Sequence, residues 1–331
     1  KDKIIFLLVS RMRLKSTLHL FLLFTLLHTN LFAQNFWVPD ANFRNKLKQL
    51  YPTCFTAQDS MITTCTVLQA ATTLNVTYSM ISSHDGIQYF TSLDTLICSF
   101  NNLSNIPVLP TSLKYLNCAF NQLTNLQILP PFLTFFQCNN NLSISLPALP
   151  NSLTDLICNN CNLYYLPALP ISLTNLICSN NQLTNLPILP ITLSILWCTK
   201  NVLTGLPTLP PNLINLNCAE NLLIGLPILP ATLTKLYCNK NQLTNLPALP
   251  ATLTHLYCNQ NQLSNLPTLP TSMTHLYCYS NQLTILPSLP ISISDLFCQG
   301  NQLITLPSLP SSLVILICGN NQLTSLPILP N

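Results

Sequence analysis

From residue 91 onward, the apolar and polar positions of the chain repeat every twenty residues. Cysteines mark the period, at positions 98, 118, 138, 158, 178, 198, 218, 238, 258, 278, 298 and 318. Twelve units therefore fill residues 91–330, and residues 171–190, ISLTNLICSNNQLTNLPILP, are representative. One such unit is too short to close a core by itself. The pattern therefore predicts a solenoid whose stacked turns share one continuous core.

The centre of each unit alternates in the way a β-strand requires. In residues 171–190 the alternation places Leu176 and Cys178 inward, and Asn175 and Ile177 outward. Successive units should stack these strands into one parallel sheet. Prolines at equivalent positions remove backbone donors and fix φ. The opposite side of the solenoid is therefore expected to be extended or polyproline-like, with little helix.

An asparagine follows the strand in nearly every unit, while position 161 carries cysteine. Facing inward, this amide can donate to and accept from backbone groups of neighbouring turns that would otherwise be buried unpaired. The cysteines of the period are expected to be inert buried thiols. We expect the resulting structural ladder to include Asn181, Asn201, Asn221, Asn241, Asn261, Asn281, Cys178, Cys198, Cys218 and Cys238.

The order L-x-x-L-x-C-x-x-N-x-L-x-x-L-P-x-L-P resembles the leucine-rich repeat, in particular the short twenty-residue bacterial type of enterobacterial effectors. The resemblance covers residues 91–330 and implies a leucine-rich-repeat solenoid with a parallel β-sheet on its concave face. Some of those effectors carry a separate C-terminal ubiquitin-ligase domain with a catalytic cysteine. Nothing like that domain follows the repeats in this sequence.

Residues 34–90 are predicted to form a small helical N-terminal cap and a first, atypical repeat. Phe43, Leu47 and Leu50 follow helical spacing after Pro39-Asp40, which is a good helix start. The segment VPDANF and the repeat after it resemble secreted leucine-rich-repeat proteins of the Bacteroidetes type. Relatives often have an acidic, glycine-containing loop after this helix, but TCFTAQDSMITTC stands here, so no calcium site is inferred.

Residues 1–33 have the layout of a secretory signal peptide, with residues 1–11 read as an upstream extension before Met12. The basic residues Arg13 and Lys15 are followed by an apolar run and then by the small residue Ala33, as at a signal-peptide cleavage site. The alternative is a membrane anchor, but the apolar run falls short of the roughly 20 residues that span a bilayer. We expect a secreted or cell-surface protein with no membrane span after signal cleavage.

The charge of the expected mature chain is balanced. From residue 34 onward, seven lysines and arginines face seven aspartates and glutamates. Such a chain lacks the electrostatic footprint of a protein that binds nucleic acid or an anionic membrane. We therefore expect no nucleic-acid partner.

The cysteines outside the regular period call for a separate interpretation. Cys54 and Cys65 lie in a segment predicted to be exported, where a disulfide between them is favoured. Cys158 and Cys161 form a C-x-x-C, but both occupy inward positions, which disfavours redox chemistry. The twenty-residue spacing does not match a zinc site. No metal and no cofactor are expected.

The outward strand positions carry the candidate ligand-binding residues. One outward column contains Trp197, Tyr237, Tyr257, Tyr277 and Phe297, and the column before it contains Lys235, His255, His275 and Asp295. Exposed apolar strips mark contact sites, and Tyr and Trp are favoured interface anchors. Two alternatives stay open. The rings can stack on one another as a cover for the sheet, and the second column can be a polar flank with His275 and Asp295 weakly paired.

These features favour an interaction protein, not an enzyme, because no nucleophile–base–acid set, paired carboxylates or phosphate loop is visible. We expect a monomer that binds a protein or glycan ligand on its concave face. A metal site at His255, His275 and Asp295 is disfavoured, because the backbones of the outer two would lie about 9–10 Å apart. The alternative functions are the recognition arm of a multidomain enzyme or effector whose catalytic domain lies beyond residue 331, and a passive spacer.

Overall fold

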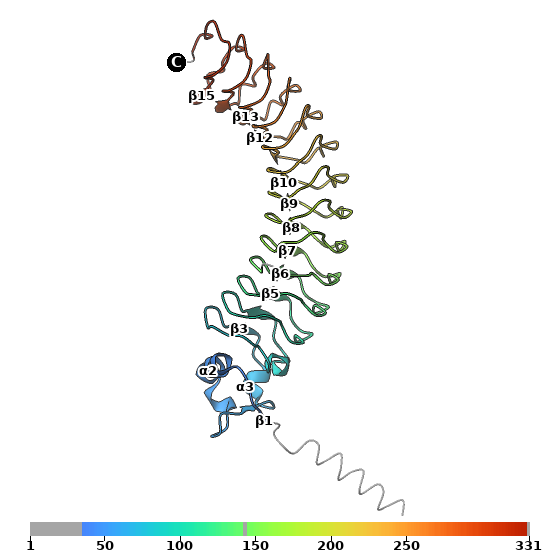
Figure 1. The fold of residues 1–331 in the computed structure, drawn as a ribbon, viewed down its shortest axis with the longest axis vertical. Helices are drawn as coiled ribbons and strands as arrows, with labels where there is room; N and C mark the ends of the chain where they lie inside the picture. Colours follow the sequence, from blue (N-terminus) through green and yellow to red (C-terminus); the bar gives the residue numbers. More distant parts are fainter. Residues whose placement is uncertain (1–34, 142–143, 330–331) are drawn as a thin grey trace, which may run out of the picture.

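The computed structural model describes residues 35–141 and 144–329, and it shows a small cap followed by an elongated, curved solenoid (Figure 1). The fold prediction is confirmed, because short parallel strands stack into one sheet on the concave side. The predicted signal peptide, residues 1–33, lies outside the described residues. Within the part of the chain that is described, no helix has the length and apolar character to cross a bilayer.

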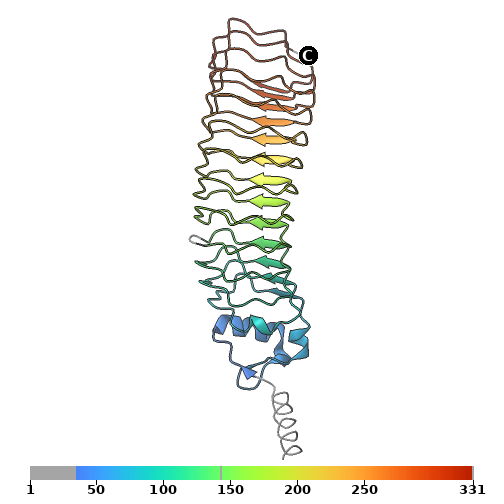
Figure 2. The same ribbon diagram turned by 90° about the vertical axis from the view of Figure 1, so that its right-hand side faces the viewer.

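The main sheet has thirteen parallel strands in the order of the sequence (Figure 2). Each residue pairs with its equivalent one unit later, as Leu216 does with Leu236. The offset is larger only at the start, where Leu74 pairs with Leu96. The strands are β3 (Thr73–Asn75), β4 (Thr95–Ile97), β5 (Tyr115–Asn117), β6 (Phe135–Gln137), β7 (Asp155–Ile157), β8 (Asn175–Ile177), β9 (Ile195–Trp197), β10 (Asn215–Asn217), β11 (Lys235–Tyr237), β12 (His255–Tyr257), β13 (His275–Tyr277), β14 (Asp295–Phe297) and β15 (Ile315–Ile317).

The core is a stack of leucines and cysteines, one set from each turn. Leu256 and Cys258 are fully buried, whereas Tyr257 between them faces the concave surface and is half-buried. The chain that returns along the convex side forms no helix between β4 and residue 329, as far as it is described. This extended return follows from the prolines, which supply no N–H for a helix. Period-two alternation therefore decides which side chains reach the concave surface.

The inward asparagines join each turn to the one before it. The amide nitrogen of Asn241 donates to the carbonyls of Cys218 and Cys238, at 3.1 Å each. Its amide oxygen accepts from the N–H of Leu223 at 3.0 Å. Equivalent bonds to the preceding turn recur at Asn181, Asn201, Asn221, Asn261 and Asn281. Each amide thus satisfies backbone groups that the sheet leaves unpaired.

The cap closes the N-terminal end of the core. It contains β1 (Asn35–Phe36) paired antiparallel with β2 (Met61–Ile62), α2 (Ala41–Leu50), α3 (Thr66–Gln69) and the short 3-10 turns η1 (Pro52–Cys54) and η2 (Ile87–Tyr89). Phe43 and Leu47 of α2 are buried as predicted. Leu50, the last residue of the helix, is 45% exposed. Tyr51, which follows it, packs against Phe90 with ring centroids 5.6 Å apart.

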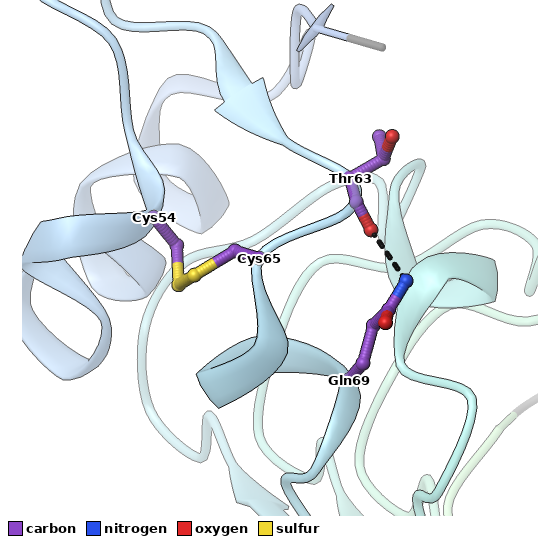
Figure 3. The surroundings of a disulfide bond; sticks show 4 residues. All are labelled: Cys54, Thr63, Cys65 and Gln69. Carbon is purple, nitrogen blue, oxygen red and sulfur yellow. Dashed lines mark hydrogen bonds between the residues drawn. A yellow bond between two sulfur atoms is a disulfide. The ribbon is translucent and has the colours of Figure 1, made fainter. Parts of the chain in front are cut away.

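Two contacts hold the cap together. Asp40 caps α2, because its carboxylate accepts from the N–H of Phe43 at 2.8 Å and from the N–H of Ser82 at 2.7 Å. Cys54 at the end of η1 and Cys65 just before α3 form a disulfide (Figure 3). The side chain of Gln69 donates to the carbonyl of Thr63 nearby, at 3.1 Å. The carboxylate of Asp40 therefore ties the start of α2 to the loop of the first repeat.

Candidate functional site

Four aromatic side chains form a continuous stack across β11, β12, β13 and β14. We call these residues, Tyr237, Tyr257, Tyr277 and Phe297, the aromatic strip. Successive ring centroids are 4.8, 4.2 and 4.2 Å apart, and the planes are tilted by 34 to 50°. All four side chains are half-buried. The rings therefore stack on one another over the sheet and keep part of their surface exposed.

Trp197 stands apart from the aromatic strip. It lies on β9 and is 40% exposed, and Asn217 of β10 occupies the register position between it and Tyr237. Among the described residues Trp197 makes no ring contact. Trp197 is therefore not part of the aromatic strip.

The neighbouring column is polar and places its groups on the same four strands. The rings of His255 and His275 stack at 4.3 Å with planes 9° apart. The Nε2 atom of His275 lies 2.9 Å from a carboxylate oxygen of Asp295. Lys235 lies beside His255 in the register of the sheet. The site thus joins an aromatic strip to a line of cationic, neutral and anionic groups.

Burial changes the proton affinities of these groups. Burial, followed by the nearby Tyr277, raises the pKa of Tyr257 to about 12. Burial, followed by the charges of His275 and Lys235, lowers the pKa of His255, while Asp295 opposes the shift. At neutral pH Tyr257 therefore offers a neutral hydroxyl, and His255 a neutral imidazole.

The site has no arrangement for metal chemistry or thiol chemistry. Within residues 35–141 and 144–329, no three histidines, cysteines or acidic residues are grouped so that they could hold a metal ion. The ladder cysteines lie behind the sheet, and burial raises the pKa of Cys258 to about 12. A thiol of this kind is a packing group, since the thiolate is the reactive form.

Sequence reasoning missed a second aromatic stack, at the loop edge of the first turns. Tyr78, Phe100 and Phe120 stack at 4.3 and 4.1 Å, and they are 71%, 37% and 41% exposed. All three have positive φ, near 55°, a conformation that bulky residues adopt at a cost. The signal was available in the sequence, because Phe100 and Phe120 are one period apart.

Two further features lie away from the aromatic strip. Tyr115 and Phe135 stack on the concave face at 4.2 Å. A cavity of about 260 Å³ is lined by residues that include Tyr164 and Tyr165, both 64% exposed. No charged side chain lines this cavity.

The comparisons with known proteins agree with this architecture. YopM from Yersinia enterocolitica WA-314 is 36% identical over 78% of this chain, with a TM-score of 0.68. YopM from Yersinia pestis, a leucine-rich effector protein, is 32% identical over 78% of this chain and 86% of its own, with a TM-score of 0.61. The chain belongs to the bacterial leucine-rich-repeat proteins. It spans 62% of the length of the Y. enterocolitica protein.

A more distant leucine-rich-repeat structure shows the same fold. InlJ from Listeria monocytogenes is 23% identical over 88% of this chain and 75% of its own, with a TM-score of 0.57. The functional domain of InlJ includes a cysteine ladder. No family model matches the leucine-rich-repeat chain, and no curated protein matches it in sequence. The shared repeat architecture identifies the solenoid as a protein-interaction repeat domain.

Proposed function

We propose that this leucine-rich-repeat protein binds a protein ligand on its concave face, over the aromatic strip. The observation that carries the proposal is the contiguity of four half-exposed aromatic side chains on consecutive strands. Aromatic residues of this kind dominate the energetics of protein interfaces. The stacked rings hold one another in place, so little side-chain entropy is lost when a ligand binds. The proposal assigns no catalytic role to the repeats.

The packing of the rings favours a protein over a glycan. Tyr257 and Tyr277 each have an aromatic ring on both sides, so their faces are covered. A sugar that stacks on an aromatic residue needs an open ring face. The strip instead presents ring edges and, from its tyrosines, hydroxyl groups, which suit the side chains and backbone groups of a protein.

The first prediction tests the aromatic strip. The double variant Tyr257→Ala, Tyr277→Ala is expected to bind its protein ligand far more weakly, since hot-spot truncations cost about 2 kcal/mol or more each. The fold should persist, because both side chains lie outside the buried core. Calorimetry with a ligand isolated by pull-down on the wild-type protein measures the loss. The strip has no binding role if the double variant retains wild-type affinity.

A matched control is available in the same chain. Tyr164→Ala, Tyr165→Ala removes two exposed tyrosines away from the strip. This variant should bind the ligand like the wild type. If it loses the ligand instead, the contact surface lies beside the cavity at Tyr164 and Tyr165, and not on the concave face.

We also propose that the protein is exported, on the basis of its basic, apolar and small-residue N-terminal segments. Expression from Met12 in a bacterial host should yield a chain trimmed near Ala33 and Gln34. Mass spectrometry of the secreted or surface fraction measures the new N-terminus. An exported chain that keeps Met12 would contradict the proposal.

A further inference from the structure

The aromatic strip runs across the strands of the sheet, so a ligand that follows it meets one ring per strand. Its four residues, Tyr237, Tyr257, Tyr277 and Phe297, hold equivalent register positions on consecutive strands. Successive ring centroids are 4.8, 4.2 and 4.2 Å apart, so two steps along the strip amount to at most about 9 Å. A peptide makes the same contact repeatedly only if its own repeat matches one or two of these steps.

Among the regular peptide conformations, polyproline II comes closest to this spacing. It has three residues per turn and a rise of about 3.1 Å per residue, so one turn is about 9.3 Å long. Side chains on one face of an extended strand recur after about 6.7 Å, which lies between one and two steps of the strip. A turn of α-helix is about 5.4 Å long and falls out of step by about 3 Å across the four rings.

The groups that the strip exposes also suit this conformation. Polyproline II has no internal hydrogen bonds, so its carbonyls are available to accept from hydroxyl groups. Burial raises the pKa of Tyr237, and it raises the pKa of Tyr257 to about 12, so both hydroxyls keep their protons at neutral pH. Aromatic-lined surfaces bind this conformation at a low cost in entropy, because it is already largely formed in the free peptide.

The charges beside the strip differ between its two ends. At the β14 end, the carboxylate of Asp295 lies 2.9 Å from Nε2 of His275. At the β11 end, Lys235 is half-buried and makes no ion pair with any described residue. An acidic residue of a ligand therefore complements the β11 end of the strip and not the β14 end.

We propose that the protein ligand of the aromatic strip is a proline-rich segment in the polyproline II conformation, with an acidic residue at the end that lies over β11. The inference rests on the proposed binding function of the strip and adds the chemistry of the partner. The segment crosses β11 to β14 and contacts the rings over about five residues. Two prolines three positions apart make equivalent contacts, and the pairing of the acidic residue with Lys235 sets the direction of the segment.

A random peptide library displayed on phage, selected on the full chain, tests the conformation. The enriched peptides should share two prolines separated by two residues, with an Asp or Glu on one side of them only. Insertion of one glycine between the prolines should weaken binding about tenfold or more, because the second proline then faces away from the strip. Enriched peptides without the proline spacing, or full affinity after the insertion, would overturn the inference.

Two forms of one enriched peptide test the acidic end. In one form the acidic residue precedes the prolines, and in the other it follows them. Fluorescence anisotropy should show that the wild-type chain prefers one form by about threefold to tenfold. Lys235→Met should bind both forms equally, whereas Lys235→Arg should keep the preference. Equal affinity of the wild type for both forms, or a preference that survives Lys235→Met, contradicts the acidic end.

Lys200→Met is the matched control for the acidic end. It removes an exposed lysine that makes no ion pair with a described residue and lies outside the aromatic strip. This variant should keep the preference of the wild type for one form of the peptide. If the preference disappears, it reflects the overall charge of the chain and not Lys235, which also contradicts the acidic end.

The Tyr257→Ala, Tyr277→Ala variant separates the two levels of the proposal. Peptides that need the tyrosines but lack the proline spacing support the proposed function and overturn the proline-rich partner alone. Proline-rich peptides that bind the double variant as tightly as the wild type overturn both. A selection without enrichment overturns the proline-rich partner, while the pull-down still tests the proposed function.

Discussion

Leu256→Ala is expected to destabilise the solenoid by about 2–5 kcal/mol. Leu256 is fully buried on β12, between its register partners Leu236 and Leu276. The substitution leaves a cavity at this position. The adjacent turns cannot move in to fill it without losing the equivalent contacts to their own neighbours. Because each turn contacts only its neighbours, the loss should be local. Denaturant titration measures its size, and hydrogen exchange should place it at β11, β12 and β13.

The convex side supplies the control for this prediction. Ile188→Ala removes an aliphatic side chain that is 88% exposed, so it should change stability by about 0.5 kcal/mol or less. A destabilisation by Leu256→Ala no larger than that of Ile188→Ala would contradict the shared leucine core. Exchange that increases evenly along all strands would contradict nearest-neighbour coupling.

The repeat region could be predicted from its sequence to the level of side-chain direction. The period of twenty gives every residue a known neighbour, namely its equivalent in the next turn. Alternation within the strand then assigns Leu256 to the core and Tyr257 to the concave surface, as the structure has them. The same reasoning places His275 beside Asp295 before any coordinates are known. In a regular repeat, the period itself shows which residues from different units are neighbours in space, whereas in most folds these contacts cannot be read from the sequence.

The cap and the turns could not be predicted in the same way. Leu50 follows the spacing of Phe43 and Leu47, but α2 ends there and Leu50 stays 45% exposed. Helical periodicity assigns a direction and does not reveal how far the core extends. The spacing of one period brings Phe100 beside Phe120, but the positive φ of both residues is not encoded in a hydrophobic pattern.

A third histidine, in the cap, is buried without a hydrogen bond. His84 has no exposed surface, and neither ring nitrogen has a hydrogen-bond partner within the described chain. Its ring packs edge-on against Phe43, with centroids 5.1 Å apart. Burial lowers its pKa from 6.5 to about 4, and the nearby charge of Asp40 only partly opposes the shift. The folded cap therefore requires His84 to be neutral.

The folded protein is accordingly expected to lose stability as pH falls from 6.5 to about 4. In this window unfolded His84 binds a proton and folded His84 does not, so acid favours the unfolded state. The full shift corresponds to a loss on the order of 3 kcal/mol. His84→Leu, which is close in volume and has no titrating group, should remove this part of the pH dependence. Denaturant unfolding of both proteins at several pH values in this window measures the difference in their free energies of unfolding. The contribution of the carboxylates is the same in both proteins and drops out of this difference. Parallel stability curves would show that His84 gains a hydrogen-bond partner or solvent in the folded cap.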